Sequence, residues 1–324
     1  MAILITGAAG FIGYHAARAR LQRGEAVVGV DCLTDYYDVA LKKARLAELS
    51  RFKGFSFEQL DLADHARVRA LVLDHGFERI LHLAAQAGVR YSIRNPFAYT
   101  RSNVEGHLSV LEAGRALGER LQHLVYASSS SVYGERPPER GFRETDAADT
   151  PVSLYAATKR ADELMARSYA HLYAMPLTGL RFFTVYGPWG RPDMAYFSFA
   201  EKMLGGETIQ LFNEGRNLRD FTFIEDILPH LEDLVDDRPG PGARIFNIGG
   251  SQPVDTLALV GALESALGVA AKTELVGPQP GDVSATWADT SALEAAYGPA
   301  PQTPLEDGVA HFAHWFRAWK AQAA

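Results

Sequence analysis

The chain has 324 residues, of which 47% are hydrophobic and 22% are charged, a composition typical of a soluble globular protein with one large or two ordinary domains. Its 32 basic and 39 acidic residues are spread along the chain and leave a net charge of -7, so no basic block is present that would follow a nucleic-acid backbone. The single cysteine, Cys32, excludes disulfides within the chain and favours a reducing compartment.

No apolar run approaches the length of a membrane span. The run Ala2 to Ile5 is too short for the core of a signal peptide, and no cationic start precedes it. We therefore expect a cytoplasmic protein that has neither a membrane nor a nucleic acid as its partner.

The first elements form a strand, a glycine turn, a helix and a second strand. Apolar residues from Ala2 to Ile5 predict a buried strand, and an apolar-periodic helix from about Phe11 to Arg23 follows the glycines. The run from Ala26 to Val30 predicts the next strand. The glycines are Gly7, Gly10 and Gly13; they would let backbone amides approach a pyrophosphate at the helix N-terminus.

Asp31 ends the second strand at the distance from the glycines where a carboxylate can accept the ribose 2'-hydroxyl of a dinucleotide. The same carboxylate would repel a 2'-phosphate, so the sequence favours NAD over NADP. A glycine triplet alone is a weak signal. The strand before it, the helix after it and the acid at the end of the next strand favour dinucleotide binding over a simple tight turn.

Further apolar runs near residues 55–60, 79–84 and 121–127 alternate with helical stretches. This alternation predicts an α/β protein with a doubly wound parallel sheet of the Rossmann type. Ligands of such sheets bind outside the carboxyl ends of the strands. We therefore expect the following strand-end residues to border the cofactor: Asp61 and Leu62, Ala84, Ala85 and Gln86, and the serines from Ser128 onward.

A helix starting near Leu154 carries Tyr155 and Lys159 four residues apart, on one face. A neighbouring ammonium favours a phenolate over a phenol, so this pair could transfer protons. The hydroxyl run Ser128 to Ser131 shortly before the helix makes this stretch the candidate reaction centre.

A strand from about 177 to 183 is followed by a Gly/Pro-dense segment, where we place a domain boundary. The domains expected are residues 1–185, binding NAD, and a smaller C-terminal α/β substrate domain over 186–324. Part of 220–250 is a candidate to return to the first domain.

The second half should hold a helix near 197–204, strands near 208–212, 220–224 and 245–248, and a closing amphipathic helix over 305–320, where His311 and His314 lie among aromatic residues. No cluster has metal-ligand spacing, so no metal is expected.

Taken together, the glycine spacing, Asp31, Asp61-Leu62, Asn103, the serine run and the Tyr155/Lys159 pair resemble the extended short-chain dehydrogenase/reductase family over the whole chain. Longer strings are similar to the NAD-dependent UDP-glucuronate 4-epimerases within it: 31–38 (DCLTDYYD), 128–134 (SSSSVYG), 181–194 (RFFTVYGPWGRPDM) and 219–226 (RDFTFIED). The resemblance implies cofactor contacts at Gly7, Gly10, Phe11, Ile12, Gly13, Asp31, Asp61, Leu62, Ala84, Ala85, Gln86, Asn103, Tyr155 and Lys159.

The resemblance also implies a reaction. Tyr155, held as a phenolate by Lys159 and by the nicotinamide, would take the proton of the sugar's C4 hydroxyl while NAD takes the C4 hydride and later returns it to the opposite face. Ser129 would bond the C4 oxygen. Further implied substrate contacts are Ser130, Ser131, Thr184, Arg191 and Arg219, with Asp282 at the uridine ribose and Arg90 as a weaker candidate. A homodimer through the helix after Asn103 and the helix bearing Tyr155 is expected by the same analogy.

The serine run contains no acid, whereas related decarboxylases carry a Glu near Ser131 and related 4,6-dehydratases an Asp-Glu pair. This absence favours C4 inversion of UDP-glucuronate. A 4-epimerase of neutral UDP-sugars and a UDP-glucuronate decarboxylase remain alternatives. A non-catalytic NAD-binding scaffold is an alternative of another class, disfavoured because Ser129, Tyr155 and Lys159 are all present.

Overall fold

The computed structural model describes residues 2–135, 139–277 and 283–323. The chain divides into two compact units. Unit 1 consists of Met1–Gly134, Ala147–Arg181 and Leu228–Phe246, and unit 2 of Glu135–Asp146, Phe182–Ile227 and Asn247–Ala324.

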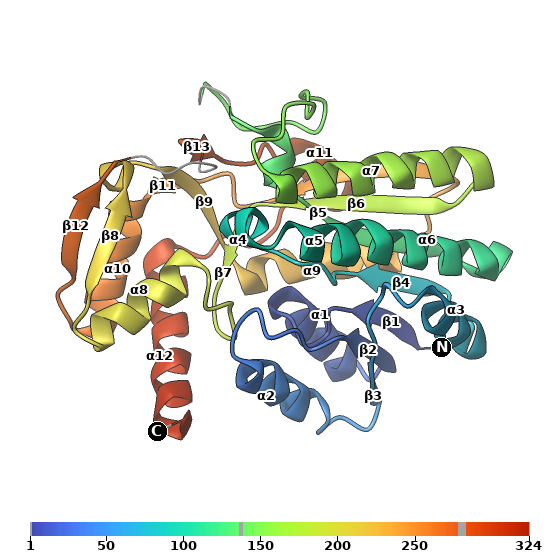
Figure 1. Ribbon diagram of the computed structural model, residues 1–324, viewed down its shortest axis with the longest axis horizontal. Helices are drawn as coiled ribbons and strands as arrows, with labels where there is room; N and C mark the ends of the chain where they lie inside the picture. Colours follow the sequence, from blue (N-terminus) through green and yellow to red (C-terminus); the bar gives the residue numbers. More distant parts are fainter. Residues whose placement is uncertain (1, 136–138, 278–282, 324) are drawn as a thin grey trace. The chain divides into compact units, whose positions relative to one another are not determined.

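Unit 1 is built on a seven-stranded sheet (Figure 1). β1 pairs in parallel with β2 and β4, β2 with β3, and β4 with β5. The strand order is β10 (Gly242–Ile248), β6 (Pro176–Phe182), β5 (His123–Ser129), β4 (Arg79–His82), β1 (Ile3–Thr6), β2 (Val27–Asp31) and β3 (Phe55–Gln59). The chain thus winds outward in both directions from β1, which confirms the predicted doubly wound Rossmann sheet and places its switch point between β1 and β4.

Helical segments connect these strands. The helices are α1 (Phe11–Gln22), α2 (Val39–Leu49), α3 (His65–His75), α4 (Val89–Arg94), α5 (Pro96–Tyr99), the π-helix Thr100–Glu105, α6 (Gly106–Leu117), α7 (Leu154–Tyr173) and α9 (Ile224–Asp236). A buried cluster that includes Val72, Val110, Leu111, Leu124 and Leu177 joins α3 and α6 to the sheet. The helices are thereby anchored to the strands whose ends carry the candidate site.

Local side-chain chemistry sets the ends of several helices. Ser153 caps α7 by accepting a hydrogen bond from the Ala156 amide, and Asp64 caps α3 in the same way. α3 ends at Gly76 in the left-handed conformation, which glycine adopts without strain. β5 lies two residues later than expected at both ends: it begins at His123, after the turn Gly118–Arg120, and extends to Ser129. The first two serines of the run therefore belong to the strand.

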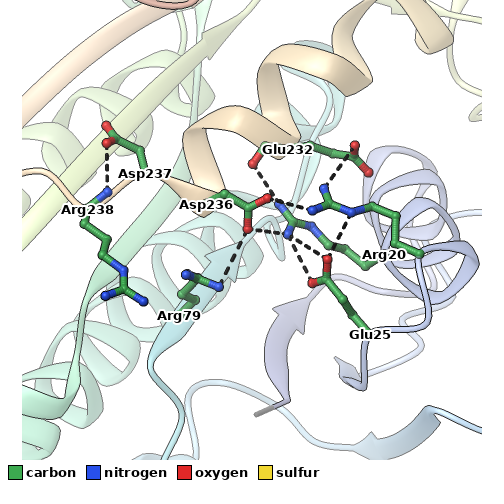
Figure 2. A network of polar contacts seen from close by, with 8 residues as sticks. Arg20, Glu25, Arg79, Glu232, Asp236, Asp237 and Arg238 are labelled. Atoms are coloured by element: carbon green, nitrogen blue, oxygen red, sulfur yellow. Dashed lines mark hydrogen bonds and ion pairs between the residues drawn. The ribbon is translucent and has the colours of Figure 1, made fainter.

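A charged cluster holds the last turns of α9 within unit 1 (Figure 2). The buried Arg20 of α1 donates to the Asp236 carboxylate at 2.6 Å and to the Glu232 carbonyl at 2.7 Å, and it also pairs with Glu25. Arg79 lies 3.6 Å from the same Asp236. Because Arg79 is the first residue of β4, this cluster lies at the amino edge of the sheet, opposite the carboxyl edge where ligands of this fold bind.

Unit 2 contains two smaller sheets. In one, β9 (Leu218–Phe223) lies between β11 (Pro253–Asp255) and β13 (Ala285–Thr286) and also pairs with β7 (Thr184–Tyr186); in the other, β8 (Thr208–Phe212) pairs in parallel with β12 (Lys272–Val276). Its helices are α8 (Ala195–Leu204), α10 (Thr256–Leu267), α11 (Ser291–Tyr297) and α12 (Leu305–Ala323). The strand predicted over 208–212 and the closing helix are confirmed.

α12 packs through its aromatic residues, as expected. Phe312 and Phe316 are fully buried, and Phe312 meets the ring of Tyr196 edge to face at 4.8 Å. Within the described part of the chain, no helix is long and apolar enough to cross a membrane.

Candidate functional site

The glycine turn between β1 and α1 leaves no room for side chains. Gly7 has a φ of +74°, and a Cβ placed on it would lie 2.8 Å from the Ala84 amide nitrogen. A Cβ on Gly13 would lie 2.1 Å from the Gly7 carbonyl oxygen. α1 begins at Phe11 after Gly10, and no side chain caps its first amides. The amides of Gly7, Ala8 and Gly10 donate to the Val30 and Gly7 carbonyls, so the amides that could meet a pyrophosphate are those of the first turn of α1.

Asp31 is buried at the end of β2. Its carboxylate accepts a hydrogen bond from the Leu33 amide at 2.8 Å and lies 3.8 Å from the ammonium of Lys42 on α2. Lys42 also donates to Thr34 at 3.0 Å. The acid expected to meet the adenosine ribose is thus held in place at the carboxyl edge.

Lys42 and Arg45 were not predicted as site residues. Arg45 is fully buried, and its guanidinium donates to the Ala9 carbonyl in the glycine turn and to the Tyr37 hydroxyl, both at 2.8 Å. On a charged amphipathic helix such residues look like surface residues. Lys42 and Arg45 are three positions apart, and Lys42 follows the buried Leu41. This spacing was the one sign in the sequence that both residues lie on the buried face of the helix.

The predicted strand-end residues lie at the same edge of the sheet. Asp61 accepts a hydrogen bond from the Ala63 amide and pairs with Arg101 at 2.9 Å, while Leu62 is buried. Ala84 donates its amide to the Thr6 hydroxyl at 3.2 Å. Ala85 and Gln86 directly follow, beyond the end of β4.

Asn103 joins the end of β4 to α7. It lies in the π-helix, and its side-chain carbonyl accepts from the Gln86 amide at 2.8 Å. Its amide group donates to the Gln86 carbonyl at 3.1 Å and to the Thr158 hydroxyl at 2.9 Å, and Thr158 donates to the Tyr155 carbonyl at 2.8 Å. Asn103 thereby fixes the backbone that carries Tyr155.

The four serines have different partners. Ser128 donates to the buried carboxylate of Glu163 at 2.6 Å. Ser129 ends β5, donates to the Ser131 hydroxyl at 3.0 Å and accepts from the Ser131 amide at 3.2 Å. Ser130 begins the short turn Ser130–Tyr133. Ser128 is therefore a packing residue, and Ser129 to Ser131 form the hydroxyl-bearing corner at the end of the strand.

Glu163 accepts the hydrogen bond from Ser128, the first serine of the run. Arg181 binds both of its carboxylate oxygens at 2.8 Å, and Arg160 adds a third contact at 2.8 Å. Although burial raises the pKa of this carboxyl, the Arg181 hydrogen bond and charge bring it below its usual value. Both carboxylate oxygens of Glu163 are thus occupied by the ion pair with Arg181.

Tyr155 and Lys159 lie one turn apart at the start of α7. The ring of Tyr155 is half-buried and meets the Tyr99 ring edge to face at 6.0 Å. Lys159 is buried; its ammonium donates to the Ala127 carbonyl at 3.0 Å and to the carboxylate of Asp162 at 3.1 Å. Asp162 was not predicted, since a carboxylate three residues after a lysine is common on exposed helix faces.

The remaining predicted substrate residues are distributed as follows. Thr184 begins β7 and pairs with Phe221 of β9. Arg219, also on β9, donates to the Leu218 and Val283 carbonyls at 2.9 and 2.7 Å, and Arg191 pairs with Asp193 at 3.2 Å. These three belong to unit 2. Arg90 is exposed on α4 of unit 1, and Asp282 lies outside the described residues. Among the described residues, no cluster of His, Cys, Asp and Glu could hold a metal ion.

Comparisons with known proteins point to one family. The model of the NAD dependent epimerase/dehydratase family matches residues 3–249. The chain is 46% identical to a probable UDP-glucuronate 4-epimerase of Rhizobium meliloti over 98% of this chain and 97% of that protein. It is 43% identical to UDP-glucuronate 4-epimerase 4 of Arabidopsis thaliana over 98% of this chain and 75% of the relative.

A solved structure is similar as well. The UDP-glucuronic acid 4-epimerase of Bacillus cereus, in complex with UDP-glucuronic acid and NAD, superposes with a TM-score of 0.92 at 31% identity, over 98% of this chain and all of that one.

The fit of the glycine turn to a dinucleotide can be tested at Gly13. Gly13→Ala places a Cβ against the Gly7 carbonyl and must displace the turn, so NAD should be lost on purification and bind at least about tenfold more weakly, a loss of about 1.4 kcal/mol. Gly261→Ala is the control, because nothing lies within 4 Å of a Cβ there. Equal NAD content in the two variants, measured after denaturation, would remove the turn from the cofactor site.

Proposed function

The chain belongs to the NAD dependent epimerase/dehydratase family, and on this premise we propose that it interconverts UDP-glucuronate and UDP-galacturonate by inverting C4, with tightly bound NAD. The observation that carries the proposal is the arrangement of Ser129, Tyr155 and Lys159 at the carboxyl edge of the sheet, in a chain similar over its whole length to proteins named UDP-glucuronate 4-epimerase.

The cofactor fits the residues of unit 1. The backbone packs so closely at Gly7 and Gly13 that only glycine fits there, α1 begins directly after this turn, and Asp31 ends the neighbouring strand β2. NAD bound there would supply the hydride acceptor, and later the hydride donor, for C4 of the sugar. Asp31 and the turn would hold the adenosine half, while Lys159 would bind the ribose of the nicotinamide half.

The protein's own groups move the proton. Tyr155, as a phenolate favoured by the Lys159 ammonium, would take the proton from the C4 hydroxyl, and the Ser129 hydroxyl would donate to the C4 oxygen. The sugar then becomes a 4-keto compound. After it turns about its diphosphate linkage, the other face meets the same groups, and Tyr155 returns the proton to the inverted C4 oxygen.

The serine run supports inversion without loss of carbon dioxide. A 4-keto glucuronate is a beta-keto acid, so the protein must hold its carboxylate in a pose that resists decarboxylation. Ser128 to Ser131 include no acid, and Glu163 behind them is bound by Arg181. We propose that Ser129 to Ser131, Thr184 and Arg191 fix the sugar, with Arg191 at its carboxylate, and that Arg219 meets the diphosphate.

The activity is tested by incubating the purified protein with UDP-glucuronate and resolving the products by chromatography. UDP-galacturonate is expected, and Tyr155→Phe should lower kcat by about 10²–10⁴-fold while NAD stays bound. A product of the UDP-xylose type alone would show a decarboxylase instead. An unchanged rate in Tyr155→Phe would remove this tyrosine from the chemistry.

The role of Arg191 is tested by substrate charge. A guanidinium binds a carboxylate through charge-assisted hydrogen bonds worth about 1.5–3 kcal/mol. Arg191→Ala should therefore lower kcat/KM for UDP-glucuronate by about tenfold or more, with a smaller effect on UDP-glucose. Arg216→Ala, which removes an exposed arginine of the same unit, is the control. Equal losses on both sugars would place Arg191 away from the carboxylate.

We also propose a homodimer through α6 and α7, which pack on each other in unit 1 (Figure 1). α7 leaves large apolar side chains uncovered: Leu164 is 53% and Leu172 64% exposed. Phe97 on the neighbouring α5 is 82% exposed. A second copy of the chain would bury this surface, at about 25 cal/mol per Å² of apolar area.

The dimer is tested by sedimentation velocity. The double variant Leu164→Glu/Leu172→Glu should sediment as a monomer, because two carboxylates would be buried in the interface. Leu275→Glu, at an exposed leucine of β12 in unit 2, should remain dimeric. A monomeric wild-type protein, or a double variant that stays dimeric, would contradict the proposal.

A further inference from the structure

Lys159 of the candidate reaction centre forms a buried ion pair with Asp162. The Lys159 ammonium is 3.1 Å from one carboxylate oxygen of Asp162, and their side chains are only 3% and 1% exposed. Asp162 lies three residues after Lys159 on α7, inside unit 1. At this depth the two charges are weakly screened, so each strongly affects the protonation of its neighbours.

Lys159 is anchored from the protein side. An ammonium has three donors, and two of them are taken by the Ala127 carbonyl on β5 and by Asp162 on α7. Counting the described residues alone, this leaves one donor for a bound ligand. Asp162 thus determines both where the ammonium lies and how much of its positive charge is left uncompensated.

Asp162 has few other partners. Its second oxygen is buried and accepts no hydrogen bond from the residues that the structure describes. Burial raises the pKa of Asp162 to about 6, against the opposing effect of Lys159. Lys159 therefore favours the charged form of the Asp162 carboxyl group. In turn, the negative charge of Asp162 acts on the Lys159 ammonium, and no other described side chain donates a hydrogen bond to this carboxylate.

The surrounding titratable groups do not supply a competing charge. Burial lowers the pKa of His107 on α6 to about 3, and that of His82 on β4 is also lowered, so both rings are neutral in the physiological range. Burial raises the pKa of Tyr126 on β5, which stays a neutral phenol. Glu163 on α7 is neutralised by Arg181 of β6 and by Arg160. On the side of Tyr155, the facing ring is Tyr99 of α5.

We propose that Asp162 is a positioning residue that, by holding the Lys159 ammonium and partly neutralising it, sets the pH range in which the Tyr155–Lys159 pair works. This inference rests on the proposed function. A negative charge beside Lys159 disfavours the phenolate form of Tyr155 and also disfavours loss of the Lys159 proton. Both effects move the working range to higher pH.

Asp162→Asn tests the proposal, because asparagine keeps the side-chain oxygen and shape but removes the charge. Both limbs of the kcat profile against pH should move to lower pH, by about one unit or more. Asp149→Asn is the matched control: it removes a carboxylate just before α7 that is 75% exposed and pairs with Arg160. Its profile should stay in place. If Asp162→Asn lowers kcat at every pH but leaves the profile at the same pH, Asp162 has only a structural role and the proposal is overturned.

Two further variants keep the test decisive. Asp162→Glu retains the charge and should keep the wild-type pH range even where it lowers kcat; a displacement equal to that of Asp162→Asn would overturn the proposal. Asp162→Ser is a second neutral variant for use if asparagine is not accepted by the fold, and it should displace the profile in the same direction.

A readout without turnover separates this inference from the proposed function. The ultraviolet absorbance of tyrosinate, titrated with pH in Asp162→Asn and in Asp162→Asn/Tyr155→Phe, isolates the ionisation of Tyr155 by difference. This ionisation should occur at lower pH than in the corresponding pair with Asp162 present. An unmoved titration overturns the role of Asp162, whereas a shifted titration in a protein that does not epimerise UDP-glucuronate refutes the proposed function alone.

Discussion

The burial of one positive charge organises the candidate site. Lys159 lies beneath the protein surface, where an unpaired ammonium would cost several kcal/mol, so its acceptors must be supplied by neighbouring elements. The Ala127 carbonyl comes from β5 and the Asp162 carboxylate from α7. Since Lys159 and Asp162 both lie on α7, the contact with Ala127 joins this helix to β5, and the contact with Asp162 holds the ammonium from within the helix.

Other buried polar contacts hold the same helix from different sides. Glu163 accepts hydrogen bonds from Ser128 of β5 and from Arg181 of β6. Thr158 accepts a hydrogen bond from Asn103 of the π-helix. Removing one member of such a buried network leaves its partners unsatisfied, which is why networks of this kind rigidify a site. α7 is thus tied to three neighbouring elements by its buried face, while its exposed leucines remain available for another surface.

Much of unit 1 follows from local patterns. Short apolar runs bounded by glycine predict buried parallel strands, and Gly7, Gly13 and Asp31 occupy positions where the turn and the strand end allow few other residues. The serine run and Tyr155 could be placed near one another because parallel strands end at a common edge. The exact ends of β5, and the division of its serines between packing and the site, required the structure, since they depend on the turn before the strand and on Glu163 behind it.

The sequence by itself determined the winding of the sheet, the glycine turn and the candidate reacting side chains, because these depend on residue type and on spacing within one or two elements. The tertiary structure decided which charged residues are buried. Lys42, Arg45, Asp162 and Glu163 all occupy helical positions that look solvent-exposed in the sequence, yet the folded chain buries each of them. Burial of a charge is a property of that long-range packing, and the partners of Lys159 could be identified only from it.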